Sequence, residues 1–220
     1  MKKIALFLAV FLTASILAPA QESVPPPDFV SLFNGRDLSG WDGNPSLWSV
    51  KDGAITGQTT AENPLKKNSF ILWKGGQVRD FELRLKFRME GGNTGIQYRS
   101  KDKGEWVVNG YQADYDMAKK YCGILYEEGG RGILAKVGEK VTIGPDGKLN
   151  LTGQTEDPDG IRKAIRDNEW NDYTIIARGN RLQHFINGHT TIDVLDEQAE
   201  KRAMEGVLAF QVHVGPPMKI

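Results

Sequence analysis

Apolar and charged residues alternate without interruption over residues 80–89, and this pattern constrains the fold more than any other feature of the chain. Phe81, Leu83, Leu85, Phe87 and Met89 alternate there with Glu82, Arg84, Lys86 and Arg88. Because successive side chains of a strand point to opposite faces, the pattern predicts a β-strand with one buried face and one wet face. This alternation is typical of antiparallel sheets that cover a core with one face and expose the other face to water.

Tight turns separate several other short segments of strand character. Asp52-Gly53 lies within residues 48–56, and Gly179-Asn180 and Asn187-Gly188 follow the strand predicted for residues 170–178. Such pairs favour β-hairpins. Residues 134–152 predict another strand-turn-strand unit, residues 153–163 predict a surface loop, and only residues 196–204 have helical character. With 25 glycines and almost no helical periodicity, the chain is predicted to be all-β, an antiparallel β-sandwich or jelly roll.

The first twenty residues have the character of a signal peptide. Lys2 and Lys3 precede an apolar run over residues 4–17, and residues 18–20 fit a small-residue cleavage site. The run is too short for a comfortable membrane span, so we expect an exported protein, periplasmic or extracellular, without a membrane span. Residues 21–28 predict a proline-rich linker and residues 29–220 a single domain. Residues 218–220 resemble the beginning of a further strand.

Charge and cysteine content exclude some classes of function. Removing Lys2 and Lys3 leaves 26 basic residues (28 − 2) against 28 acidic ones, a net charge of −2. This balance gives no electrostatic basis for binding nucleic acid or an anionic membrane. Cys122 is the single cysteine, so no intrachain disulfide forms, and its apolar neighbours predict a buried, inert thiol.

Three further predicted strands each turn two polar side chains to one face. These pairs are Gln97 with Arg99, Gln112 with Asp114, and Gln211 with His213, each alternating with apolar or aromatic residues. Amides, a cation, a carboxylate and an imidazole are what a concave sugar-binding sheet would carry. They are equally what an ordinary solvated sheet face carries, so the pattern leaves both interpretations open.

An ordered set of short segments resembles one known family over nearly the whole of residues 29–220. The segments are residues 32–41 (LFNGRDLSGW), 80–84 (DFELR), 92–96 (GNTGI), 110–114 (GYQAD), 170–173 (WNDY), 178–181 (RGNR), 186–188 (ING) and 211–213 (QVH). Together they resemble the 3-keto-disaccharide hydrolase family. The resemblance implies a secreted jelly roll of the concanavalin/laminin-G type. It also implies a carbohydrate substrate, a glycoside oxidised at C3 of the sugar ring, and cleavage of its glycosidic bond.

The keto group determines which catalytic groups such a reaction needs. A carbonyl at C3 makes the proton on C2 acidic, so a general base can remove it, and the resulting enediolate can expel the C1 substituent. Water then adds, and the net result is hydrolysis. This route needs a base near C2, a cation or metal near the C3 oxygen, and an acid near the leaving oxygen. Direct hydrolysis remains the alternative.

Five residues are the candidates for these catalytic roles. Asp114 and His213 are candidate bases, and together they could hold one divalent metal ion as cofactor. Arg99 could neutralise the enediolate. In the charged loop of residues 126–132, Glu127 or Glu128 could supply the acid or a metal ligand. The alternatives are a surface histidine, a solvated arginine, and a turn with a local ion pair.

Substrate contacts are predicted for a second set of residues. Gln97, Gln112 and Gln211 would bond sugar hydroxyls, and Arg131 would clamp the substrate. Tyr111, Tyr126 and Trp106 could stack on a sugar ring, although large aromatics in sandwiches more often belong to the core. His184 shares a face with apolar residues and is predicted to be packed. Residues 157–160 predict a turn rather than a calcium loop.

The sequence therefore leaves two main interpretations and one minor one. The first is a secreted enzyme that cleaves 3-keto-glycosides, and the second is a non-catalytic carbohydrate-binding module of the same fold. The third is a protein-interaction domain. Convergence of Asp114, His213 and Glu127 in one cleft would favour the enzyme, whereas scattered positions would favour a binding module or no site at all.

Overall fold

The computed structural model describes residues 28–220. The signal peptide predicted for residues 1–20 lies outside the described residues, as does the predicted linker apart from Asp28. Leu32–Ile220 form one compact unit. The strands are β1 (Trp41–Gly43), β2 (Trp48–Lys51), β3 (Ala54–Gly57), β4 (Ser69–Trp73), β5 (Phe81–Phe87), β6 (Asn93–Asp102), β7 (Val108–Asp116), β8 (Leu125–Glu128), β9 (Gly132–Ala135), β10 (Glu139–Ile143), β11 (Leu149–Gln154), β12 (Asn171–Arg178), β13 (Arg181–Ile186), β14 (His189–Asp196) and β15 (Val207–Val212).

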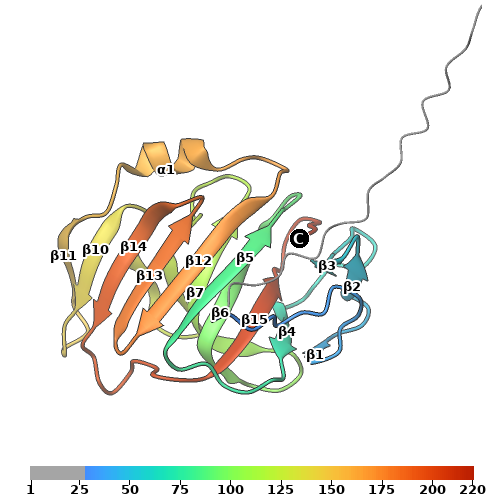
Figure 1. The fold of residues 1–220 in the computed structure, drawn as a ribbon, viewed down its shortest axis with the longest axis horizontal. Coiled ribbons are helices and arrows are strands. Elements are labelled where there is room, and N and C mark those ends of the chain that lie inside the picture. Colours follow the sequence, from blue (N-terminus) through green and yellow to red (C-terminus); the bar gives the residue numbers. More distant parts are fainter. Residues whose placement is uncertain (1–27) are drawn as a thin grey trace, which may run out of the picture. The chain divides into compact units, whose positions relative to one another are not determined.

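Two large sheets form the two layers of this unit (Figure 1). The seven-stranded sheet has the order β1-β4-β15-β6-β7-β8-β9, and the six-stranded sheet has the order β11-β10-β14-β13-β12-β5. The pairing is antiparallel except between β10 and β14. Strands β2 and β3 form a separate hairpin. The predicted all-β, antiparallel β-sandwich is confirmed.

The hydrophobic core fills the space between the two sheets. Tyr98 and Tyr115 from the seven-stranded sheet meet Phe87 and Tyr173 from the six-stranded sheet, and the rings of Phe87 and Tyr115 are 4.1 Å apart. His184 lies in this core with its Nε2 2.8 Å from the Tyr98 hydroxyl, as its apolar face predicted. Aromatic packing across the two layers therefore contributes to holding the sandwich together, alongside the aliphatic side chains of the same core.

The single helix of the described residues corrects the sequence prediction. Helix α1 covers Pro158–Ala164, within the segment predicted as a surface loop. The Asp157 side chain accepts from the N–H groups of Asp159 and Gly160, and Pro158 opens the first turn. Residues 197–204, where helical character was predicted, form turns and irregular chain. Asp157 therefore caps the helix, and Asp159 lies in its first turn, where the sequence had predicted only a turn.

Residues 218–220 add a short paired segment to the sandwich. Lys219 bridges to Gln58 on one side and to Glu90 on the other. Gly57 and Ile220 exchange two backbone hydrogen bonds of 2.9 and 3.0 Å. This segment therefore connects the β2–β3 hairpin to the chain that follows β5.

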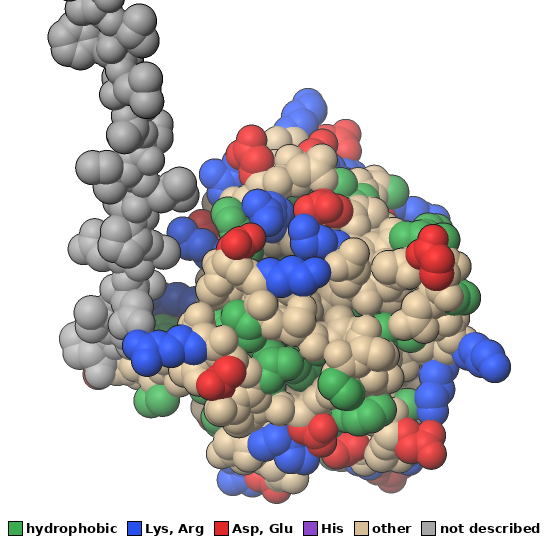
Figure 2. Space-filling model, turned by 90° about the vertical axis from the view of Figure 1, so that its right-hand side faces the viewer, with side chains coloured by type: hydrophobic (Ala, Val, Ile, Leu, Met, Phe, Trp, Pro, Cys, Tyr) green, Lys and Arg blue, Asp and Glu red, His purple; other side chains and the backbone are tan. Residues whose placement is uncertain are grey.

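The surface of the described part of the chain agrees with its balanced composition. On the face in Figure 2, Lys and Arg side chains are interspersed with Asp and Glu, and hydrophobic side chains form small groups between them. Within residues 28–220 no helix is both long enough and apolar enough to cross a membrane.

Candidate functional site

The outer face of the seven-stranded sheet carries the polar side chains that the sequence placed together. Ile96, Tyr98, Tyr111 and Ala113 point into the core between the sheets. Because side chains alternate, Gln97, Gln112 and Asp114 point outward. Gln211 joins them from β15 through a hydrogen bond to Gln112, so these four side chains share one face of the sheet. They are buried there, so the prediction of a face open to water is wrong for them.

Hydrogen bonds connect these side chains into one chain that ends at Asp114. The Ser100 hydroxyl donates to Gln97 Oε1 over 2.6 Å, and Gln97 Nε2 donates to Gln112 Oε1 over 2.7 Å. Gln112 Nε2 then donates to Asp114 Oδ1 over 2.5 Å. Gln211 Nε2 donates to Gln112 Oε1 over 3.3 Å. The amide groups therefore bond to one another and to the carboxylate.

The turn between β6 and β7 covers this amide cluster. Phe70 N–H donates to the Trp106 carbonyl, and Trp106 Nε1 donates to Asp42 over 2.9 Å, so the turn reaches β4 and β1. In the order of the sheet, β15 lies between β6 and β4. The turn therefore crosses the outer face of the sheet over β15. Val108 and Trp106 pack there against a small apolar cluster of β4 and β15. In consequence Gln97 and Gln211 are 0 % exposed and present no amide to a ligand.

Asp114 is the chemically distinctive group of the face. Burial raises its pKa from 3.8 to about 7 against the opposing hydrogen bond from Gln112, and the negative charges of Glu128 and Asp116 raise it further. The side chain of Asn93 also donates to this carboxylate and lowers its pKa. A carboxyl with a pKa of about 7 exchanges its proton near neutral pH, as a general base or acid must.

Strand β8 places Glu128, and not Glu127, on the face of Asp114. Leu125 belongs to the core and Glu127 shares its side, so Tyr126 and Glu128 point outward. Glu128 accepts a hydrogen bond of 3.2 Å from Asn68 Nδ2. Burial raises the Tyr126 pKa, with smaller contributions from the Glu128 and Asp114 charges. The outer face thus holds two carboxyl groups, Asp114 and Glu128, beside a phenol.

Arg99 lies on the other side of its strand, so its predicted common face with Gln97 is wrong. The pairing of β6 with β7 shifts register between Tyr98 and Lys101, and Arg99 has a φ of 48°. This bulge gives the outward position to Ser100. The buried guanidinium instead bonds the carbonyl oxygens of Arg79 and Gly179 and the carboxylate of Asp80. Those partners give Arg99 a structural role at one end of the sandwich.

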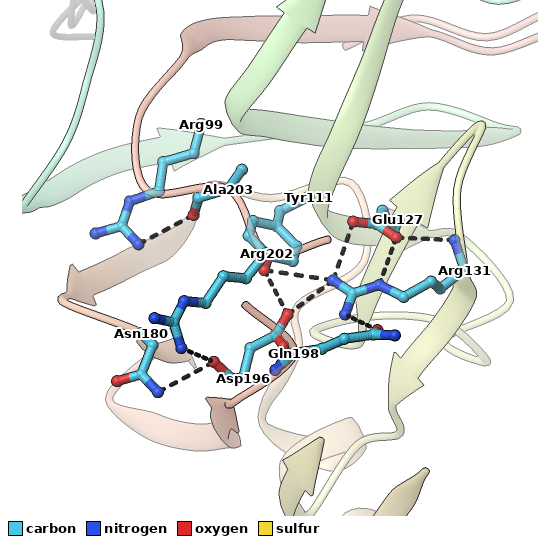
Figure 3. A network of polar contacts seen from close by, with 9 residues as sticks. All are labelled: Arg99, Tyr111, Glu127, Arg131, Asn180, Asp196, Gln198, Arg202 and Ala203. Atoms are coloured by element: carbon cyan, nitrogen blue, oxygen red, sulfur yellow. Dashed lines mark hydrogen bonds and ion pairs between the residues drawn. The ribbon is translucent and has the colours of Figure 1, made fainter. Parts of the chain in front are cut away.

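Glu127 and Arg131 do meet, but on the inward side (Figure 3). Arg131 lies 2.7 Å from Glu127 and 2.7 Å from Asp196, and it donates to Gln198 over 3.1 Å. The Tyr111 hydroxyl donates to Asp196 over 2.5 Å, and the Tyr111 side chain is 1 % exposed. The predicted stacking of Tyr111 on a sugar is therefore wrong, because the ring belongs to the core. Glu127 and Arg131 form a closed ionic network instead of a substrate clamp.

His213 follows β15 directly, and its imidazole contacts the adjoining backbone. Its Nδ1 lies 2.5 Å from the Val214 carbonyl oxygen, and Val214 N–H donates to Asn68 Oδ1 over 2.9 Å. Within residues 28–220, no three His, Cys, Asp or Glu side chains are grouped to hold a metal ion. Because Glu127 faces inward, the convergence of Asp114, His213 and Glu127 that would have favoured the enzyme is not found among the described residues. The group on the outer face is Asp114 with Glu128, Tyr126 and Asn68.

A cleft of about 450 Å³ lies beside the turn that covers the amides. Its lining comprises Asn44, Leu47, Leu65, Lys66, Lys67, Ser69, Glu105 and Trp106. An ion pair of 3.0 Å joins Lys67 to Glu105. Asn68, the partner of Glu128, lies in the chain between two lining residues. No local sequence pattern marked Asn68, because its contact is made with a residue sixty positions away.

Comparison with known families agrees with the resemblance found in the sequence. The family described as 3-keto-alpha-glucoside-1,2-lyase-like domain matches residues 28–219. This match supports a carbohydrate-active protein. No curated protein sequence matches the chain.

Solved structures share the fold at low sequence identity. A candidate glycosyl hydrolase from Parabacteroides distasonis ATCC 8503 has a TM-score of 0.55 and 19% identity, covering 84% of this chain and 91% of that one. A second one from the same organism has a TM-score of 0.53 and 18% identity, covering 86% and 88%. The carbohydrate-binding module CBM66 from Bacillus subtilis has a TM-score of 0.51 and 18% identity, covering 82% and 91%. At these identities the likeness establishes the jelly-roll fold.

Proposed function

Because the chain belongs to the 3-keto-alpha-glucoside-1,2-lyase-like family, we propose that it cleaves the glycosidic bond of glycosides oxidised at C3 of the sugar. The observation that carries this proposal is Asp114, a buried carboxyl with a pKa of about 7 beside the second carboxyl of Glu128. Two carboxyl groups in unlike environments are the usual arrangement for acid–base work. A module that only binds sugar needs no such group.

Asp114 acts first, as the general base. It takes the proton from C2, and the electron pair of that C–H bond passes toward C3, where the carbonyl oxygen becomes the enediolate oxygen. The enediolate then collapses: its oxygen re-forms the C3 carbonyl, the C1=C2 double bond forms and the C1–O bond breaks, and the leaving oxygen takes a proton from Glu128. Water finally adds across the C1=C2 double bond: its hydroxyl bonds to C1 while its proton passes to Glu128, and C2 takes a proton from Asp114, so both carboxyl groups return to their starting states.

Tyr126 and the cleft beside Trp106 are the parts of this region that can meet the sugar. Tyr126 is partly exposed on the face of Asp114, and Trp106 lines the cleft that adjoins Asn68. Aromatic faces pack well against sugar rings because C–H groups give one face of the sugar an apolar surface. The three glutamines contribute indirectly, because they are buried.

Cleavage of a 3-keto-glucoside beside its unoxidised parent tests the proposal. We expect cleavage of the keto form alone, loss of at least about a hundredfold in kcat/KM for Asp114→Asn, and solvent deuterium at C2 of the product in D₂O. Retention of the C2 proton would refute elimination and leave direct hydrolysis. A chelator arm tests for a metal ion.

The competing function is a carbohydrate-binding module of the same fold. Sugar binding by calorimetry without cleavage of either substrate, and without any effect of Asp114→Asn on that binding, would replace the enzyme with this module.

We also propose that the protein is exported, on the strength of the leader-like residues 1–20. Fractionation of cells that express the full chain should place the protein outside the cytoplasm, with a new N-terminus near Gln21. Full-length protein in the cytoplasm would contradict this.

A further inference from the structure

We propose that Ser100, Gln97 and Gln112 are positioning residues that keep an N–H group directed at the Asp114 carboxylate. The inference rests on the proposed function in that Asp114 is the base it serves. Its basis is the hydrogen-bonded chain from Ser100 to Asp114, in which each link is 2.7 Å or shorter. All members are at least nine-tenths buried, so water does not replace a missing partner.

The direction of this chain follows from donor and acceptor chemistry. An ionised carboxylate only accepts hydrogen bonds, so Gln112 must turn its NH₂ group toward Asp114. Gln112 Oε1 then faces the opposite way, where it accepts from both Gln97 and Gln211. Flipping the Gln112 amide alone would bring its NH₂ group against two other NH₂ groups and its oxygen against the carboxylate.

Gln211 gives independent support for this direction. Its Oε1 is buried and has no hydrogen-bond partner. Buried polar atoms without a partner are uncommon, and each costs about 1–3 kcal/mol. Gln211 therefore keeps an orientation that is unfavourable for its own oxygen while it donates to Gln112. Two donors on one oxygen hold the Gln112 amide more firmly than one does.

The groups around Asp114 make the side-chain N–H of Gln112 important for the charge state of the Asp114 carboxyl. Asp116 on the same strand and Glu128 on β8 are acidic, and Tyr126 and the core residue Tyr173 are the nearby phenols. The groups that favour the ionised form of Asp114 are hydrogen-bond donors, Gln112 with the larger effect and Asn93 with the smaller one. Loss of the Gln112 donor should therefore raise the Asp114 pKa and keep the base protonated at neutral pH.

Replacement of Gln112 by methionine tests the inference, because methionine keeps the length of the side chain and removes the N–H. In Gln112→Met the acidic limb of the pH profile of kcat/KM should move up by at least about one pH unit, equal to a tenfold loss below the limb. Activity should recover above the limb, which a merely structural defect would not allow. Ser100→Ala, a smaller change that spares the packing, should shift the limb in the same direction by less.

Direct titration of the Asp114 carboxyl carbon by NMR supplies a readout that is independent of turnover. Gln112→Met and Ser100→Ala should raise the measured pKa, and Gln154→Met on the exposed strand β11 should leave it unchanged. An unmoved titration in folded Gln112→Met would overturn the inference. If Asp114→Asn kept full activity while the titration shifted, the proposed base would be wrong and the positioning would stand.

Discussion

Arg131 is the residue whose loss should most damage the stability of the sandwich. Its guanidinium and backbone N–H make five hydrogen bonds to Glu127, Asp196 and Gln198. The side chains of Arg131, Glu127 and Asp196 are 11, 12 and 1 % exposed. Replacement by methionine would leave two carboxylates facing each other in this buried space without their cation.

The magnitude follows from how buried ion pairs behave. Removal of one partner leaves an uncompensated charge out of water and costs about 3–5 kcal/mol. For a domain of this size the loss corresponds to a fall in Tm of about 6–20 °C. The free energy of unfolding in Arg131→Met should fall by that amount in urea titrations, while the dependence on urea concentration keeps its slope.

Arg181 offers a matched control. It makes two hydrogen bonds to the Asp193 carboxylate, of 2.8 and 2.6 Å, but its side chain is 57 % exposed. Arg181→Met should therefore lower the free energy of unfolding by less than about 1 kcal/mol. Equal losses in the two variants, or a loss under about 1 kcal/mol for Arg131→Met, would refute the argument from burial. Turnover per folded molecule should survive in Arg131→Met, because its network faces away from Asp114.

Three further outcomes are expected. The raised pKa of Asp114 means that the folded state holds its proton up to about pH 7, whereas the unfolded chain releases it near 3.8. The contribution of Asp114 to the free energy of unfolding should therefore fall as pH rises between those values. Asp114→Asn should remove this pH-dependent contribution when unfolding in urea is measured at several pH values. Tyr98→Phe should cost about 1–3 kcal/mol in the same assay, because it leaves His184 Nε2 buried without its partner. Burial raises the pKa of the Cys122 thiol, so a thiol reagent should label it only as fast as the chain unfolds; fast labelling of native protein would contradict its placement in the core.

Local patterns in the sequence predicted the strands well because each pattern has a local cause. The alternation of residues 80–89 became β5, and Asp52-Gly53 and Asn187-Gly188 became turns with positive φ at both residues. The helix at residues 158–164 was missed although Asp157-Pro158 is a recognised start signal, because the segment is short and rich in turn residues.

The site was harder to predict because its composition depends on register and on distant contacts. One residue of register decides whether Glu127 or Glu128 faces outward, and the alternation of so short a strand does not fix it. The bulge at Arg99 reverses the face of a residue that strict alternation had placed beside Gln97. Asn68 reaches Glu128 only through the fold. By contrast, Gln97, Gln112 and Asp114 were grouped correctly because β6 and β7 pair in one unbroken register from Asn93 to Tyr98.

The position of β15 in the seven-stranded sheet has a consequence for the order of folding. It is the last strand of the described residues, yet it lies between β4 and β6 and is hydrogen-bonded to both. Until residues 207–212 are in place, the β1–β4 ribbon has no partner and β6 has an open edge. A nascent chain emerging from the ribosome therefore cannot assemble this sheet stepwise. The contacts that join its two parts span more than a hundred residues, so completion of the sheet should be slow and should follow the synthesis of Val212.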